Sequence, residues 1–285
     1  MKPDTKQVFN LAKLSLNEDV PSVDLTTTNL IPPTCRVSAR IVAGERCVVA
    51  GLGLARYVFK YLDRNCVWRA KYSDGDIVRN GRTVATITGL ARAILTAERT
   101  ALNFLGHLSG IATLTRRFVE RVKGSGVDIY DTRKTAPGLR VIEKYAVRCG
   151  RGHNHRMNLS EMVLIKDNHI KICRNEKLPL GQLISFMRGK IPRGTRIEIE
   201  VQNLRQLDFA LKNPPDIIML DNMDFKTLQK AVGVIRKSGH DIEIEVSGRV
   251  NLKNIERIAR LKVDRISTGE ITHSAPAMDF SLEII

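Results

Sequence analysis

The chain has 285 residues, of which 43% are hydrophobic and 27% charged, and its formal net charge is +16. This composition is typical of a folded, water-soluble protein, and no apolar run is long enough to cross a bilayer. The N-terminal segment lacks the apolar core of a signal peptide, so we expect a cytoplasmic protein. The five cysteines are scattered without a CxxC pair, which favours reduced thiols over a zinc site or a disulfide framework.

The basic charge is compatible with nucleic acid, an anionic membrane surface or small acidic ligands as partners. Aromatic residues make up only 5% of the chain, and Lys and Arg are spread along its whole length. Single-strand binders instead interleave basic and stacking residues. A nucleic-acid-binding protein therefore remains only a rival hypothesis, and its signature would be binding that weakens steeply with added salt.

The first part of the chain predicts mixed helices and strands. Alternating β-branched residues over 35–51 predict one or two strands, and a helix is expected over 53–62. Asp-Gly and Asn-Gly pairs between short Val and Ile runs in 71–89 predict tight turns joining further strands. From Ala91 apolar residues recur at helical spacing, which predicts one long helix.

After residue 112 short apolar runs alternate with helix-like segments. The runs begin at Val127, Met162, Ile197, Asp216, Ile242 and Arg265. The last four start 19 to 26 residues apart, which is the length of one strand, one helix and two short loops. This rhythm predicts a β/α barrel with a domain boundary near residue 112.

Many polar residues follow the predicted barrel strands, at the end where barrel enzymes carry their active sites. They are Arg133, Lys134, Lys166, Asp167, Asn168, Glu200, Asn203, Asp221, Asn222, Ser247, Gly248, Thr268 and Gly269. A barrel with a purely structural role does not need this many charged residues at one edge. The edge is therefore our candidate active site.

The cations of this edge predict a ligand with several negative charges. They are Arg133, Lys134, His155, Arg156 and Lys166. Arginine offers a planar fork to carboxylates and phosphates, and such charge-assisted hydrogen bonds are the strong ones. His153, His155 and His169 could suggest a metal site, but their spacing matches no zinc motif and the nearby cations would repel a metal ion.

Two carboxylates and two small-residue pairs complete the candidate site. Glu200 and Asp221 are expected on adjacent strands, where they could hold a Mg²⁺ ion against a diphosphate. Ser247-Gly248 and Thr268-Gly269 would let backbone N–H groups approach a phosphate. Alone, a carboxylate at a strand end is usually just solvated and a Ser-Gly pair is usually a turn. A functional site is favoured because all these residues fall at the same edge.

Several segments resemble the quinolinate phosphoribosyltransferase family, and the resemblance runs almost from end to end. The segments are AILTAERTALNFLGHLSGIAT (from Ala93), DTRKTAPGLR (from Asp131), EKYAV (from Glu143), HNHR (from His153), LIKDNH (from Leu164), EIEV (from Glu198), MLDN (from Met219), EVSG (from Glu245) and ISTGEITHS (from Ile266). The resemblance implies an N-terminal α/β sandwich domain over 1–111, joined by 270–285, and a partly open seven-stranded β/α barrel of type II phosphoribosyltransferases over 112–269. It also implies a homodimer, or a hexamer of dimers.

The resemblance also implies an activity and the residues for it. Quinolinate and 5-phosphoribosyl 1-diphosphate would give nicotinate mononucleotide, CO₂ and diphosphate, a step of de novo NAD biosynthesis. Quinolinate would be bound by Arg133, His155, Arg156 and Lys166, with Arg99 from the neighbouring subunit. The diphosphate substrate and Mg²⁺ would be bound by Lys134, Glu200, Asp221, Ser247, Gly248, Arg249, Thr268, Gly269 and His273. Lys134, Glu200 and Asp221 are the expected catalytic residues. An enzyme of the same fold that acts on a monocarboxylate such as nicotinate is the alternative, although the full set of cations favours a dicarboxylate.

Three segments depart from the family pattern. The glycine triplet before His-Arg reads Gly150-Arg151-Gly152, and Ser-Gly-Gly reads Ser247-Gly248-Arg249. A glycine-rich motif near the N-terminus has become residues 19–24. Arg151 is the most unexpected change, because only glycine adopts some backbone conformations at low cost.

Overall fold

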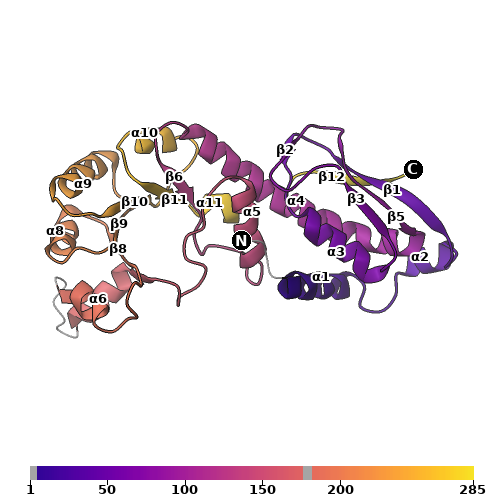
Figure 1. Cartoon of the computed structure of the whole chain (residues 1–285), viewed down its shortest axis with the longest axis horizontal. Coiled ribbons are helices and arrows are strands. Elements are labelled where there is room, and N and C mark those ends of the chain that lie inside the picture. Colours follow the sequence, from indigo (N-terminus) through magenta and orange to yellow (C-terminus); the bar gives the residue numbers. More distant parts are fainter. Residues whose placement is uncertain (1–4, 176–181) are drawn as a thin grey trace. The chain divides into compact units, whose positions relative to one another are not determined.

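The computed structural model describes residues 5–175 and 182–285. The chain forms two compact units (Figure 1). Unit 1 comprises Met1–Arg116, Thr135–Gly152 and Ile271–Ile285, and unit 2 comprises Arg117–Lys134 and His153–Glu270. The expected boundary at residue 112 falls inside a continuous helix. The segment Thr135–Gly152, which we expected in the barrel domain, is grouped with unit 1.

Unit 1 is built on an antiparallel sheet with strand order β12-β1-β5-β3, beside the short pair β2-β4. Its elements are α1 (Thr5–Asp19), α2 (Leu25–Leu30), β1 (Arg36–Ala43), β2 (Cys47–Val48), α3 (Leu52–Leu62), β3 (Val67–Ala70), β4 (Ile77–Val78), β5 (Thr83–Leu90), α4 (Ala91–Arg121), α5 (Arg140–Cys149), α11 (Glu270–His273) and β12 (Phe280–Ile284). The strands and the long helix predicted for this region are confirmed. The C-terminal strand β12, yellow in Figure 1, pairs with β1, so the end of the chain belongs to this unit.

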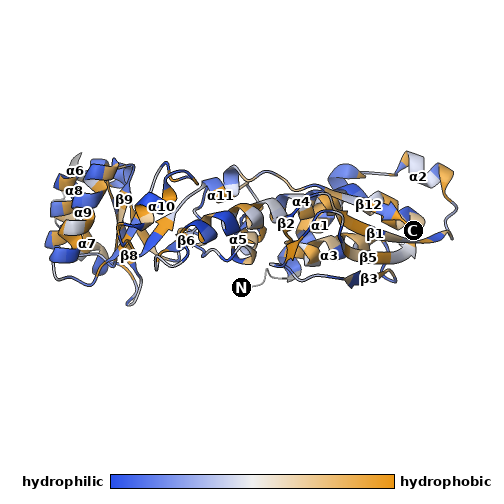
Figure 2. Ribbon diagram, turned by 90° about the horizontal axis from the view of Figure 1, so that it is seen from above, coloured by the Kyte–Doolittle hydropathy of each residue, from blue (hydrophilic) through white to orange (hydrophobic). Residues whose placement is uncertain are grey.

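The core of unit 1 is apolar. Alternating residues Ile41 and Ile87 of the central strands are fully buried, as are Val58 and Phe59 of α3, and apolar residues are orange along β1 and β5 in Figure 2. In helix α4 a Cβ atom at Gly106 would lie 2.7 Å from the carbonyl oxygen of Met278. Glycine therefore lets the C-terminal segment pass directly over the helix.

Unit 2 is an alternation of strands and helices around a parallel sheet, as predicted. Its elements are β6 (Asp128–Tyr130), β7 (Val163–Ile165), α6 (Asp167–Asn175), α7 (Leu183–Arg188), β8 (Ile197–Val201), α8 (Leu204–Lys212), β9 (Ile217–Asp221), α9 (Phe225–Lys237), β10 (Glu243–Ser247), α10 (Ile255–Ala259) and β11 (Arg265–Ser267). The described residues form six strands in the order β6-β11-β10-β9-β8-β7, rather than the seven expected. A single parallel bridge between Tyr130 and His153 extends the row beyond β6.

Strand register gives the parallel sheet an apolar face and a polar face. Glu198 lies beside Ile217, Met219 beside Glu245, and Glu245 beside Arg265, and paired residues point to the same side. The polar face therefore carries Tyr130, Glu198, Glu200, Asp221, Glu243, Glu245, Ser247, Arg265 and Ser267. The opposite face carries buried residues such as Ile199, Ile218 and Val246.

Local signals explain where the helices begin. The side chain of Asn203 accepts a hydrogen bond from the N–H of Gln206 and so caps α8, and Asp224 caps α9 in the same way through Thr227. Helices α8 and α9 pack on each other beside the sheet (Figure 1). In the described part of the chain, no helix combines the length and the apolar character that a membrane span needs.

Candidate active site

The structure gathers most of the predicted site residues at the carboxyl ends of the parallel strands of unit 2. Lys166 follows β7, Glu200 lies near the end of β8, Asp221 ends β9 and Ser247 ends β10. Arg133, Lys134, His155, Arg156, Gly248, Arg249, Thr268 and Gly269 also belong to this unit. Arg99, exposed on α4, and His273, on α11, belong to unit 1.

The predicted metal ligands Glu200 and Asp221 are close enough to affect each other. Burial raises the pKa of Glu200, Lys166 lowers it, and the Asp221 and Glu198 carboxylates raise it. Lys166 Nζ lies 3.0 Å from Glu200 Oε1. Asn222, which was also expected at this edge, donates from Nδ2 to Asp221 Oδ2 at 2.8 Å. The edge thus holds two neighbouring carboxylates, each already oriented by a partner.

The loop after β10 depends on Gly248. Its φ is +85°, and a Cβ atom there would lie 2.8 Å from the backbone nitrogen of Asn222 and closer still to the Asn222 side chain. Asn222 itself has a φ of +52° and donates its N–H to the carbonyl oxygen of Ser247 at 3.1 Å. The two strand ends are therefore packed backbone to backbone, and any larger residue than glycine at position 248 would separate them.

Both arginines in the positions of family glycines adopt the left-handed conformation that glycine favours. The φ of Arg151 is +70° and that of Arg249 is +50°. Such a conformation costs on the order of 1 kcal/mol or more for a residue with a Cβ atom. Arg151 is exposed in the turn after α5, and Arg249 is exposed in the loop that follows Gly248. The sequence departures therefore keep the local backbone shape, at the cost of strain.

Arg156 is buried and held at its head group. Its Nη1 donates to the carbonyl oxygen of Met162 at 3.0 Å. Burial lowers the pKa of Arg156, the charge of Arg133 lowers it further, and Glu198 and Glu200 raise it. The two arginines predicted to bind carboxylates therefore lie close enough to repel each other. A ligand with two carboxylates would relieve this repulsion.

Asp131 anchors the segment that precedes Arg156. Its carboxylate is fully buried and accepts hydrogen bonds from the backbone N–H of His155 at 2.9 Å and from Asn154 Nδ2 at 2.7 Å. The N–H of Asp131 donates to the carbonyl oxygen of His153 at 3.0 Å. Hydrogen bonds thus join the segment that begins at Asp131 to the segment 153–156.

A buried ionisable cluster lies on the polar face, and sequence reasoning missed it. His155 Nε2 is 3.0 Å from Glu198 Oε2 and 3.6 Å from Glu245 Oε2, and both carboxylates are fully buried. Burial and the neighbouring Glu198 charge raise the pKa of Glu245 well above its ordinary value. The sequence EIEV occurs twice, in β8 (Glu198 and Glu200) and in β10 (Glu243 and Glu245). This repeat was a usable signal, because residues two apart in a strand share a face. Only the second glutamate of the first pair, Glu200, was predicted.

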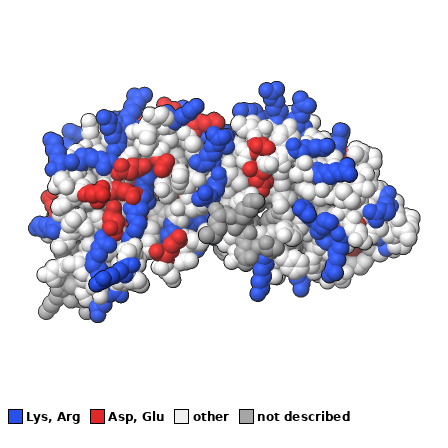
Figure 3. All heavy atoms as spheres, in the orientation of Figure 1, with Lys and Arg blue, Asp and Glu red and all other residues white. Residues whose placement is uncertain are grey.

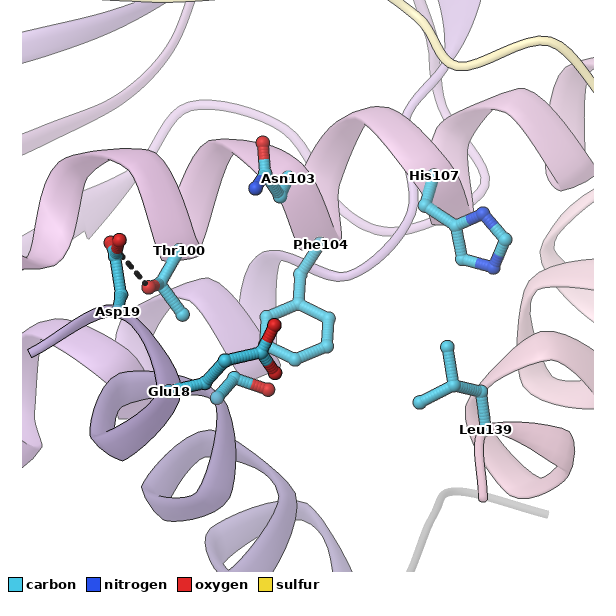
Figure 4. A pocket seen from close by; sticks show the side chains of 8 residues that line it. Glu18, Asp19, Thr100, Asn103, Phe104, His107 and Leu139 are labelled. Atoms are coloured by element: carbon cyan, nitrogen blue, oxygen red, sulfur yellow. Dashed lines mark hydrogen bonds between the residues drawn. The ribbon is translucent and has the colours of Figure 1, made fainter. Parts of the chain in front are cut away.

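The structure also contains a pocket of 380 Å³ in unit 1, lined by Ser15, Glu18, Asp19, Thr100, Asn103, Phe104, His107 and Leu139 (Figure 4). Among the residues that the structure describes, none of the predicted site residues lines it. Its two carboxylates would repel an anionic substrate. The buried Glu143 beside it pairs with His107 at 2.9 Å and accepts from the backbone N–H of Ala136 at 3.2 Å, which gives His107 a structural role.

The basic surface shows no single concentrated tract on the face drawn in Figure 3, where Lys and Arg side chains are scattered over both units. On this face the distribution is that of a general basic surface, whereas the cations of a nucleic-acid groove follow one continuous path.

Comparison with known proteins agrees with these motifs over nearly the whole chain. Residues 24–109 match the family model of the quinolinate phosphoribosyl transferase N-terminal domain, and residues 111–283 match that of its C-terminal domain. A probable nicotinate-nucleotide pyrophosphorylase [carboxylating] of Synechocystis is 39% identical over 95% of this chain and 90% of its own length. Its counterpart in Methanocaldococcus jannaschii is 39% identical over 97% of both chains.

Solved structures agree equally well. The fold matches NadC from Streptococcus pyogenes with a TM-score of 0.92 and 37% identity, over 100% of this chain and 99% of the other. It matches the nicotinate-nucleotide pyrophosphorylase from Francisella tularensis with a TM-score of 0.92 and 36% identity, over 100% and 98%. Both family domains are matched, and the relatives align over almost their full length. The parallel sheet also carries cations and carboxylates at one edge. This chain therefore belongs to the quinolinate phosphoribosyltransferase family.

Proposed function

We propose that this chain transfers the phosphoribosyl group of 5-phosphoribosyl 1-diphosphate to quinolinate, with loss of one carboxylate. The products would be nicotinate mononucleotide, CO₂ and diphosphate, which places the enzyme in NAD biosynthesis. The observation that carries the proposal is the grouping of Arg133, Arg156 and Lys166 with Glu200 and Asp221 at one edge of the parallel sheet. The family membership supports the same reaction.

The cations of the edge would bind quinolinate. Arg133 and Arg156 are mutually repelling neighbours, and each can hold a carboxylate in a planar, two-bond contact. Lys166 adds a third positive group at the end of β7. Nicotinate, with one carboxylate, would leave part of this charge uncompensated. A dicarboxylate is therefore the better fit.

The residues at the ends of β10 and β11, in the middle of the sheet, would bind the diphosphate substrate. Ser247, Gly248, Thr268 and Gly269 offer hydroxyl and backbone N–H groups to phosphate oxygens, and Lys134, Arg249 and His273 are proposed to add positive charge. Glu200 and Asp221 fit a Mg²⁺ ion, because they are neighbouring carboxylates and this ion prefers oxygen ligands. When bound, Mg²⁺ would neutralise charge on the diphosphate.

The reaction would proceed by displacement at the anomeric carbon. The pyridine nitrogen forms a bond to that carbon as the carbon–oxygen bond to diphosphate breaks, and the electron pair leaves with diphosphate. The ribose carries positive charge in the transition state, and Lys134 would stabilise the departing oxygen. The ring nitrogen is then quaternary, so the adjacent carboxylate can leave as CO₂ because its bonding electrons are stabilised by the ring, and a proton takes its place.

We further propose that the enzyme is a homodimer, or a hexamer of dimers, in which Arg99 serves the active site of the neighbouring subunit. Arg99 is exposed on α4, and this exposure leaves its guanidinium available to a second copy of the chain.

A product assay tests the proposed reaction. Purified protein with quinolinate, 5-phosphoribosyl 1-diphosphate and Mg²⁺ should give nicotinate mononucleotide, detected by mass spectrometry. Chelation with EDTA, or replacement of quinolinate by nicotinate, should abolish the product. The Arg133→Ala variant should raise the KM for quinolinate by about 10-fold or more, because it loses a charge-assisted contact. Equal product from nicotinate would instead favour the monocarboxylate alternative.

A further inference from the structure

Two cations with proposed roles in substrate binding, Arg133 and Lys134, lie on a short segment between two anchored points of the chain. The first anchor is Asp131, whose buried carboxylate accepts two hydrogen bonds within unit 2. The second anchor begins at Thr135, the first residue after the chain passes from unit 2 into unit 1. Only the cation segment, residues 132–134, lies between them. Whatever fixes the second anchor therefore restricts both cations.

The second anchor contains a tight turn that is set by its own sequence, Ala136-Pro137-Gly138-Leu139. The N–H of Leu139 donates to the carbonyl oxygen of Ala136 at 3.1 Å, and the φ of Gly138 is +81°. Proline at the second position and glycine with a positive φ at the third are typical of a type II turn. Helix α5 begins at the next residue, Arg140. The turn is therefore a preformed connection between the cation segment and α5.

Two side chains of α5 reach back to the residues that follow the cation segment. Glu143 Oε2 accepts a hydrogen bond from the N–H of Ala136 at 3.2 Å, and the Glu143 side chain is 1% exposed. Arg140 Nε donates to Thr135 Oγ1 at 3.1 Å. Without the Glu143 carboxylate, the Ala136 N–H would lose its bond to the helix and the turn would be free to shift.

His107 orients this carboxylate from another helix. Its Nε2 lies 2.9 Å from Glu143 Oε1. His107 belongs to α4, and it lines the same pocket as Leu139, the last residue of the turn (Figure 4). A glutamate side chain has several rotatable bonds, and contacts at both oxygens restrict them. Glu143 is therefore a fixed bridge between α4 and the turn.

The Glu143 contact differs from an ordinary helix cap. In such a cap the side chain of the N-cap residue accepts a hydrogen bond from an N–H in the first turn of the helix. The N-cap residue of α5 is Leu139, whose side chain has no acceptor. Glu143 lies inside the helix and bonds to Ala136, which precedes the N-cap. Its carboxylate thus holds the chain before the helix rather than the N–H groups of the helix itself.

We propose that Glu143 is a positioning residue, oriented by His107, which holds the turn at Ala136 so that Arg133 and Lys134 stay in position for the two substrates. Glu143 acts through the chain between Ala136 and the cation segment, and the two cations make the substrate contacts. The effect on the reaction rests on the proposed function, whereas the anchoring of the turn does not.

Hydrogen exchange tests the anchor without any activity. We expect the Ala136 N–H to exchange about 5-fold or more faster in Glu143→Ala than in wild type, measured by NMR on ¹⁵N-labelled protein. Glu143→Gln should keep most of the protection, because its amide oxygen can still accept. Asp63→Ala is the matched control, since Asp63 is another buried carboxylate of unit 1 and accepts from the N–H of Leu90 at 3.0 Å. Equal exchange in wild type and Glu143→Ala would overturn the proposal.

Kinetics test the consequence for the reaction. Glu143→Ala should lower kcat/KM by about 10-fold for both substrates, because small displacements of binding groups slow an oriented reaction. Glu143→Gln should stay within about 3-fold of wild type. Asp63→Ala should stay within about 2-fold, even where thermal unfolding shows that it has lost stability. Equal losses of kcat/KM in Glu143→Ala and Asp63→Ala, or no rescue by Gln, would refute a positioning role.

A second variant keeps the proposal testable if Glu143→Ala does not fold. His107→Leu leaves Glu143 in place but removes the contact at Oε1, and it should lower kcat/KM by about 3-fold. Unchanged kinetics and unchanged exchange at Ala136 in this variant would refute the role of His107 in the bridge. If the wild-type protein does not convert quinolinate, the proposed function fails, while the exchange of Ala136 still decides whether Glu143 holds the turn.

Discussion

The two units of this chain bury very different residues beside their sheets. In unit 1, Ile41 and Ile87 of the antiparallel sheet and Phe59 of α3 form an apolar core. In unit 2, the polar face of the parallel sheet buries Glu198 and Glu245 completely. An apolar core is satisfied by any close packing, whereas buried charges are satisfied only by particular partners at particular distances. Burying Glu198 and Glu245 therefore lowers the stability of unit 2, and it places side chains in particular positions near the candidate active site.

Each unit also contains a histidine–glutamate pair, and the pairs differ in the same way. The His107 side chain is 33% exposed beside the buried Glu143 in unit 1, whereas His155 and Glu198 are 6% and 0% exposed in unit 2. Glu143 holds a loop through Ala136. His155 holds a residue of the candidate active site. The pair in which both partners are buried is thus the one that directly holds an active-site residue, Arg156.

The largest effect should come from removing Arg265, the arginine beside the buried Glu245. Arg265→Met leaves the buried Glu245 without its neighbouring arginine, whereas Glu243 keeps its contact with Arg196. We expect a loss of about 3 kcal/mol in the free energy of unfolding. Urea denaturation measures this loss. The matched control is Arg236→Met, since the Arg236–Asp264 pair is largely exposed and should contribute less than about 1 kcal/mol. Equal losses in the two variants would mean that burial of Arg265 beside Glu245 carries no special cost.

A medium effect should appear in the pH dependence of stability. The folded-state pKa of Glu245 is raised above its ordinary value of 4.5, so the folded protein retains this proton after the unfolded chain has released it. The resulting stabilisation is complete below about pH 4.5 and is lost as pH rises through the folded-state pKa, by up to about 1.4 kcal/mol per pH unit.

Glu245→Gln removes this titration while keeping the shape of the side chain. Relative to wild type, the variant should therefore gain stability as pH rises above about 4.5, and the two should be similar below it. Urea denaturation at several pH values measures the difference. A constant difference across this range would contradict the raised pKa of Glu245.

The smallest effect should come from relieving strain in unit 1. Arg151→Gly removes a side chain from a residue with a φ of +70°. We expect a gain of about 0.5–1 kcal/mol, because the relief of left-handed strain exceeds the extra entropy that glycine gives the unfolded chain. Thermal unfolding measures the gain. Arg151→Ala keeps the Cβ atom and should show no gain; an equal gain would assign the effect to charge rather than backbone strain.

Much of the fold could be predicted from local pattern. The strand–helix rhythm after residue 112 and the long helix from Ala91 depend on periodicity, which each segment carries by itself. The grouping of Lys166, Glu200, Asp221 and Ser247 at one edge followed from the rule that parallel strands end on the same side of a sheet. The grouping of Thr135–Gly152 with unit 1 had no local signal, because it depends on contacts between segments far apart in the chain.

The alternation in IEIEV marks two faces of a strand, and the sequence by itself determined that much. It could not determine whether the glutamate face meets water or the interior, because period-two alternation is identical in the two cases. The tertiary structure decided this by burying Glu198 and Glu245 completely and by bringing His155 and Arg265 close to them. A buried charge is stable only when distant segments supply its partners, and those distances exist only in the folded chain.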